Sequence, residues 1–146
     1  MGTTHDFQDG KGPGPAHQHL NGGGWVADTA IVADTAYVGP MATVRDYAVV
    51  GNLSAVRDVA VVRDRAIVCD YAVVCDRAEI RNYALVCNSA LVCDHATICD
   101  SVMVRDRAVV RDSAVVCDHA EVCGDSEISG HTAVSGDALV YNKRLK

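Results

Sequence analysis

The sequence predicts an all-β solenoid, in which short strands wind around one long core. Three observations predict it. Every sixth residue from Val26 to Val140 is Val or Ile, at twenty positions without an exception or an insertion. Two residues before these anchors the side chain is small, and fifteen of the nineteen such positions from Ala30 to Ala138 are Ala. Two residues after the anchors stand twelve Asp, four Asn, three Gly and one Pro. Because a six-residue unit cannot bury its own apolar side, the units must stack on their neighbours.

Each unit has the pattern of one short strand followed by one corner. Side chains alternate along a strand, so the small residue and the anchor two places later lie on the same, inward side. Asp, Asn and Gly tolerate a left-handed or turn-like backbone, which predicts a bend after every anchor. A helix is excluded, because a period of six slides around a 3.6-residue turn and would scatter the anchors over the surface.

The order of residue types within a unit is also informative. Val134-Ser135-Gly136-Asp137-Ala138 and Val26-Ala27-Asp28-Thr29-Ala30 run aliphatic, small or charged, Gly or Asp, variable, then small. In this pattern the chain resembles the hexapeptide-repeat proteins of the bacterial transferase type, over residues 25 to 140. The resemblance implies a single-stranded, left-handed parallel β-helix of triangular section with about three units per coil, and a bacterial or phage origin. In such a coil, residues eighteen apart stack at about 4.8 Å.

Three segments follow in order along the chain. Residues 1–24 are rich in Gly, Pro, His and Gln, and we expect a flexible arm or an N-terminal cap over the first coil. Residues 25–141 are the expected β-helix. Residues 142–146 form a basic tail, whose charge would protect the open edge of the last coil. His17 and His19 are weak candidates for a metal site, which would require a trimer axis to bring several copies together. No other metal site is expected.

Seven cysteines all occupy the slot directly after an anchor, where other units carry Arg. Stacking at eighteen residues predicts three pairs of thiols: Cys69 with Cys87, Cys75 with Cys93, and Cys99 with Cys117. The odd number and the lack of a secretion signal oppose a disulfide framework, and one stacked pair supplies only two of about four ligands that zinc requires. We therefore expect reduced thiols in a cytoplasmic protein. No apolar run is long enough to span a membrane.

The same register sorts the outward side chains into three faces. A second face carries Tyr37, Ala55, Val73, Leu91 and Val109, and partial coverage of this face is an open alternative. A third carries a ladder of arginines and has a more solvated character. The first face carries a nearly continuous aliphatic column, interrupted only by Glu121, which consists of Ile31, Val49, Ile67, Leu85, Met103 and Leu139. An aliphatic stripe of this height exceeds what a monomer usually leaves in water. We predict side-by-side self-association through these six residues, as the trimer common among the proteins that this chain resembles. The alternative is that an unidentified protein partner covers these six residues.

The corner Asp residues are expected to form stacked acidic columns along three edges. Like charges at this spacing repel each other, and the neighbouring Arg residues are expected to offset the repulsion. Calcium bridging is an alternative, because carboxylate oxygens are suitable ligands, but the repeat is not the nine-residue calcium-binding kind.

Two functions remain open from the sequence. The formal net charge of −6 argues against a nucleic-acid partner. The preferred hypothesis is a non-catalytic structural or protein-interaction solenoid, with no catalytic residue and no cofactor. The alternative follows from the resemblance, since many hexapeptide-repeat proteins are acyltransferases that bind acyl-coenzyme A between subunits beside a histidine. Those enzymes interrupt the repeat with a loop, which is absent here, and His95, His119 and His131 all fall at corners without an evident orienting partner.

Overall fold

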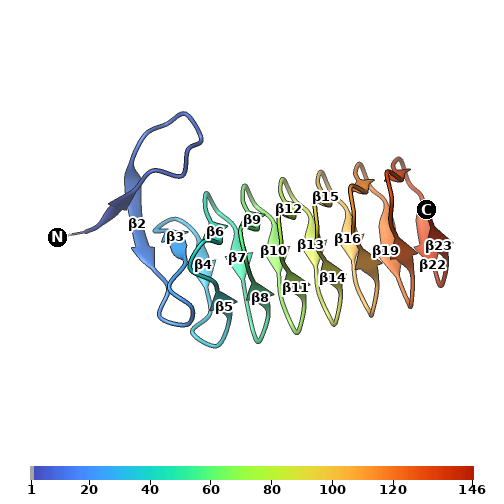
Figure 1. The fold of residues 1–146 in the computed structure, drawn as a ribbon, viewed down its shortest axis with the longest axis horizontal. Helices are drawn as coiled ribbons and strands as arrows, with labels where there is room; N and C mark the ends of the chain where they lie inside the picture. Colours follow the sequence, from blue (N-terminus) through green and yellow to red (C-terminus); the bar gives the residue numbers. More distant parts are fainter. Residues whose placement is uncertain (1) are drawn as a thin grey trace.

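The chain forms a solenoid of stacked coils. The computed structural model describes residues 2–146, and this part of the chain contains strands and no helix. The coils follow one another along the long axis of the molecule, from the N-terminal end to the C-terminal end (Figure 1). Each coil crosses three sheets in turn, which gives the triangular section. The predicted fold class, an all-β, left-handed parallel β-helix with three units per coil, is confirmed.

The first sheet has nine strands and includes two strands from the N-terminal segment. In spatial order they are β1 (Thr4–His5), β2 (Gly14–Gln18), β3 (Trp25–Ala27), β6 (Thr43–Val44), β9 (Val61–Val62), β12 (Glu79–Ile80), β15 (Thr97–Ile98), β18 (Val115–Val116) and β21 (Ala133–Val134).

The second and third sheets have seven strands each. The second consists of β4 (Ile31–Val32), β7 (Val49–Val50), β10 (Ile67–Val68), β13 (Leu85–Val86), β16 (Met103–Val104), β19 (Glu121–Cys123) and β22 (Leu139–Tyr141). The third consists of β5 (Tyr37–Val38), β8 (Ala55–Val56), β11 (Val73–Val74), β14 (Leu91–Val92), β17 (Val109–Val110), β20 (Glu127–Ile128) and β23 (Arg144–Leu145).

Strand pairing follows the eighteen-residue register over the repeat region. Ile67 pairs in parallel with Val49 on one side and with Leu85 on the other. Because the register is the same in all three sheets, residues eighteen apart form straight columns along the solenoid. The stacking that the sequence predicts is confirmed by these pairings.

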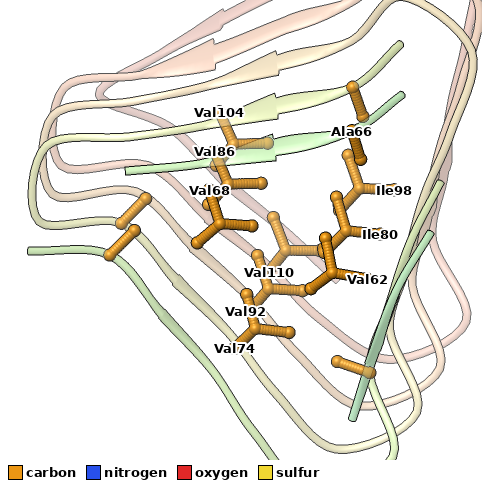
Figure 2. Packing of buried hydrophobic residues seen from close by; sticks show 14 of the residues in the cluster. Val62, Ala66, Val68, Val74, Ile80, Val86, Val92, Ile98, Val104 and Val110 are labelled. Carbon is orange, nitrogen blue, oxygen red and sulfur yellow. The ribbon is translucent and has the colours of Figure 1, made fainter. Parts of the chain in front are cut away.

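The core is a single apolar column enclosed by the three sheets. Every anchor from Val38 to Ile128 has no exposed surface. Figure 2 shows the anchors of the three sheets converging: Val62, Ile80 and Ile98 from the first, Val68, Val86 and Val104 from the second, and Val74, Val92 and Val110 from the third. The small residue beside each anchor leaves room for its neighbour, so the narrow interior is filled by Val, Ile and Ala alone over most of its length.

The corners adopt the left-handed backbone that their composition predicts. Every corner residue from Asp46 to Gly136 has a positive φ, between 55° and 67°. Asp, Asn and Gly tolerate this conformation better than other residues do. The three corners nearest the N-terminus, at Asp28, Asp34 and Pro40, do not have positive φ values.

Both ends of the repeat region carry additional strands. In residues 2–24, β1 pairs antiparallel with β2, and β2 pairs antiparallel with β3 of the first coil. This hairpin projects beside the first coil (Figure 1). At the other end, part of the expected basic tail forms β23, which pairs with β20 in the third sheet. None of the described residues belongs to a helix long and apolar enough to cross a membrane.

Candidate interaction surface and side-chain clusters

The aliphatic column lies on the outer face of the second sheet, one residue per strand. Its members come from β4, β7, β10, β13, β16 and β22, and the parallel register stacks them in a line. Ile31 is 65% exposed, Ile67 is 40% exposed and Leu139 is 60% exposed, while Val49, Leu85 and Met103 are half-buried. The structure therefore brings the first five residues together as one continuous stripe over five successive coils.

A charged pair separates this stripe from Leu139. Glu121 of β19 occupies the next place in the column, between Met103 and Leu139. Its Oε1 lies 2.6 Å from Nη2 of Arg105. This ion pair ends the aliphatic stripe toward the C-terminus, so Leu139 stands apart from the other five residues.

The column beside the stripe consists of small side chains. Ala33, Gly51, Cys69 and Cys87 occupy it in four successive coils, before Arg105. These side chains rise little above the sheet, so a partner could approach the aliphatic stripe closely. The flat surface and its apolar stripe define the candidate interaction surface.

Ion pairs lie on the other two faces as well, and the third sheet also carries an apolar column over five coils, which consists of Tyr37, Ala55, Val73, Leu91 and Val109. On the first sheet, Nη2 of Arg63 donates to Oε1 of Glu79 at 3.0 Å, and Arg81 approaches the same oxygen at 3.4 Å. On the third sheet, Nη2 of Arg111 lies 2.6 Å from Oε1 of Glu127. The hydrogen bond from Arg111 lowers the pKa of Glu127, so this carboxyl group stays ionised to a lower pH than an ordinary glutamate.

The corner side chains form ladders that the sequence does not reveal. Twelve corner carboxylate or amide oxygens each accept the backbone N–H of the corner residue one coil further on, at 2.8–3.2 Å. Along one edge, for example, Asp46 accepts from Asp64, and Asp64 accepts from Asn82. Each carboxylate thus gains a donor from the backbone.

Arginines neutralise four of these corners, as the sequence predicts. In each, the guanidinium lies 3.1–3.4 Å from the next residue's carboxylate: Arg45 with Asp46, Arg63 with Asp64, Arg105 with Asp106 and Arg111 with Asp112. The expected offset of the like charges is therefore present, and the backbone donors add to it. Where Cys takes the place of Arg, the adjacent carboxylates have no such partner within 4.0 Å among residues 2–146; they are Asp70, Asp76, Asp94, Asp100 and Asp118.

All seven cysteines are free thiols. The three predicted pairs lie eighteen residues apart, and the two thiols of the Cys69 and Cys87 pair are close enough to hydrogen-bond. Burial raises the pKa of Cys75 from its ordinary value of 9.0 to about 12, and the charges of Asp76 and Cys93 add to the effect. Burial likewise raises the pKa of Cys69 and of Cys93, each to about 11. These thiols are therefore protonated and weakly nucleophilic at neutral pH.

Two clusters unite thiols with corner carboxylates. In one, ligand atoms of Cys75, Asp76 and Cys93 all lie within 4.8 Å of one another. In the other, the same holds for Asp100, Cys117 and Asp118. The eighteen-residue register predicts the stacked thiols alone. The carboxylate beside them was missed, although the Val-Cys-Asp spacing carries the signal.

His17 and His19 of the N-terminal segment have different hydrogen-bond partners. Nδ1 of His17 is 2.8 Å from Oδ1 of Asp28, and this pair is exposed. His19 is only 6% exposed, and its Nε2 is 2.8 Å from the carbonyl oxygen of Ala36. Each candidate metal ligand therefore has a hydrogen-bond partner of its own within the chain.

The three histidines of the repeat are exposed corner residues. His95 and His131 lie along the edge between the third and first sheets, separated by two coils, and His119 lies along the edge between the first and second sheets. His95 lines a shallow groove of about 360 Å³ with Asp58, Asp76 and Arg77. The structure does not bring the three histidines together.

Comparisons of this chain with protein-family models, with curated proteins and with solved structures found no match. The class of the protein is therefore defined by its own geometry. It is a parallel β-solenoid of eighteen-residue coils, with apolar columns on the outer faces of the second and third sheets and three hydrogen-bonded corner ladders.

Proposed function

We propose that this chain is a non-catalytic structural or protein-interaction solenoid that associates with copies of itself, side by side, through the outer face of the second sheet. The observation that supports this most is the exposed aliphatic stripe of Ile31, Val49, Ile67, Leu85 and Met103, in register over five coils. Exposed apolar stripes of this extent mark protein interaction surfaces.

A second copy is the occupant whose geometry fits best. The stripe repeats at the spacing of the coils, about 4.8 Å, and a second solenoid carries an apolar row at the same spacing. Its flat, small-residue flank permits close approach of such a row. A standard interface buries about 800 Å² per partner, so the flanking columns must take part as well as the stripe. The trimer is the arrangement expected from the resemblance to hexapeptide-repeat proteins.

Substitution on two faces tests the proposal. Ile67→Arg and Leu85→Arg each place a charge in the stripe, and Val115→Arg places one in the equivalent slot of the first sheet. Val115 is a matched control because it is 37% exposed, against 40% for Ile67. Light scattering on a size-exclusion column under reducing conditions gives the solution mass, relative to 15.4 kDa for one chain.

We expect a discrete oligomer for the natural chain and for Val115→Arg, and a monomer for the two stripe variants. A natural chain that is monomeric at all concentrations would contradict the proposal, as would an oligomer that only Val115→Arg dissociates. The acyltransferase alternative is tested with the same proteins. Acyl-coenzyme A binding that is lost in Ile67→Arg and in a His119→Ala variant would favour that alternative.

A further inference from the structure

Along one edge of the solenoid, thiol and carboxylate side chains, which are soft and hard metal ligands respectively, lie close together beside paired strands. The edge lies between the third and first sheets, where Cys75 follows β11 and Cys93 follows β14. Parallel pairing of these strands fixes the two thiols one above the other. Ligand atoms of Cys75, Asp76 and Cys93 lie within 4.8 Å of one another. We propose that this corner binds a thiophilic divalent cation of the Zn²⁺ or Cd²⁺ class.

The backbone holds the three ligands in place. The N–H of Cys75 donates to the carbonyl oxygen of Val92 at 3.0 Å, which locks the first thiol to the next coil. Oδ2 of Asp76 lies 3.8 Å from Sγ of Cys75 and accepts the N–H of Asp94 at 3.2 Å, which leaves this oxygen a second lone pair. That oxygen remains available as a ligand.

The fourth ligand would come from Asp94, which lies outside the three-ligand group and approaches Cys93 alone. The Sγ of Cys93 lies 3.9 Å from Oδ2 of Asp94. Two thiolates and two carboxylates make a four-coordinate set of the kind that zinc accepts, with Zn–S distances of about 2.3 Å and Zn–O distances of about 2.0–2.2 Å. Thiolate ligands select soft and borderline cations over Mg²⁺ or Ca²⁺. Binding releases the two thiol protons to the buffer, because the thiolates are the ligands.

The local charge favours a cation at this corner. At four Arg-bearing corners the guanidinium already pairs with the carboxylate, as between Arg111 and Asp112 at 3.4 Å. At the Cys-bearing corner, Asp76 and Asp94 have no Arg or Lys within 4.0 Å among residues 2–146. The exchange of Arg for Cys thus replaces a built-in cation with a pair of metal ligands.

This proposal does not depend on self-association, because the cluster lies on an edge away from the aliphatic stripe of the second sheet. The test is a titration of the full-length chain with cadmium chloride, and then with zinc as a competitor. Cadmium bound to thiolates absorbs in the ultraviolet through charge transfer. A phosphine reductant keeps the thiols reduced without binding the metal strongly. All proteins carry Cys117→Ser, so that the second cluster does not contribute.

Four proteins are compared: the Cys117→Ser reference, and the same chain with Cys75→Ser and Cys93→Ser, with Cys69→Ser and Cys87→Ser, or with Asp76→Asn. The Cys69 and Cys87 pair is the matched control, since it is stacked in the same way but forms no such three-ligand group among the described residues. Far-ultraviolet circular dichroism checks that each variant keeps its strands.

We expect the reference and the control to bind one Cd²⁺ with the thiolate absorbance. The Cys75 and Cys93 double variant should lose this absorbance, and Asp76→Asn should weaken binding at least about tenfold, since even outer-shell partners contribute that much. Absence of the absorbance in the reference, or its persistence when Cys75 and Cys93 are both Ser, would overturn the proposal.

Discussion

At the residue scale, a single corner aspartate both bends the chain and accepts a hydrogen bond from the next coil. Asp64 has a φ of 61°, and its Oδ2 accepts the N–H of Asn82 in the next coil at 3.0 Å. The residue therefore both makes the bend and links one coil to the next. Asn serves the same purpose, because Oδ1 of Asn82 accepts the N–H of Asp100 at 3.0 Å. Gly124, Gly130 and Gly136 make the bend without a side-chain acceptor.

Three substitutions of Asp64 separate these contributions. Asp64→Asn keeps an acceptor and should change the free energy of unfolding by less than about 0.5 kcal/mol, because the partly exposed pairing with Arg63 contributes little. Asp64→Gly keeps the bend and loses the acceptor, for a loss of about 1–2 kcal/mol. Asp64→Ala should lose about 1 kcal/mol more, because a Cβ disfavours the left-handed conformation. Urea unfolding measures the free energy of unfolding of the three variants and so ranks them. Equal stability of the Gly and Ala variants would show that the bend is not strained.

The thiols give a prediction about pH. Burial raises the pKa of Cys75 to about 12 and that of Cys93 to about 11. A raised pKa lowers the thiolate fraction at any given pH, and the thiolate is the nucleophile. In metal-free protein, alkylation of both residues by iodoacetamide, followed by peptide mass spectrometry, should keep accelerating above about pH 10. A rate that levels off by about pH 10, as for a thiol with the ordinary pKa of 9.0, would show that the surroundings do not suppress ionisation.

At the scale of elements, the N-terminal hairpin is joined to the first coil by backbone contacts. The N–H of Gly24 donates to the carbonyl oxygen of Val38 at 2.9 Å, and the N–H of Val38 donates to that of Asn21 at 3.0 Å. Trp25, the only tryptophan, stacks on His5 of β1 with ring centroids 4.4 Å apart. The fluorescence of Trp25 therefore reports on the attachment of the hairpin.

Gly24→Ala should loosen this attachment. Gly24 is buried, and a Cβ there would overlap the carbonyl oxygen of Gly39 and the Val38 side chain. Gly14→Ala is the matched control in the same hairpin, because a Cβ at Gly14 meets nothing within 4 Å. We expect the Trp25 transition of Gly24→Ala to occur at lower urea than the circular dichroism transition of the coils. Coincident transitions in this variant would contradict a separately attached hairpin.

The sequence predicts the repeating elements and not the end elements. Two-residue strands and corners follow from the six-residue period, since that period fixes which residues face inward. The hairpin of β1 and β2 lies outside the period, and its Gly and Pro content indicates only a cap or an arm. Strand β23 was also missed, because Arg144 pairs with Glu127 seventeen residues away, one fewer than the period requires.

At the scale of the whole molecule, the eighteen-residue register determines which side chains stack on most of the surface. The eighteen-residue register places Ile67 between Val49 and Leu85 and stacks the thiols, so the aliphatic stripe and the cysteine pairs could be predicted residue by residue. The corner ladders could not, because they depend on the direction of backbone N–H groups that the side-chain pattern does not reveal. The partners of His17 and His19 depend on the path of the hairpin, which no period fixes.

Methionine oxidation measures whether the second sheet is buried between copies of the chain. Met103 lies in the aliphatic stripe, whereas Met41 is a corner residue that is 72% exposed. A short pulse of hydroxyl radicals, followed by peptide mass spectrometry, measures the conversion of each to its sulfoxide. We predict that Met103 in the natural chain is oxidised more slowly as protein concentration rises, and more slowly than in Ile67→Arg, while Met41 reacts equally in both. Equal oxidation of Met103 in the natural chain and in Ile67→Arg at every concentration would contradict this burial.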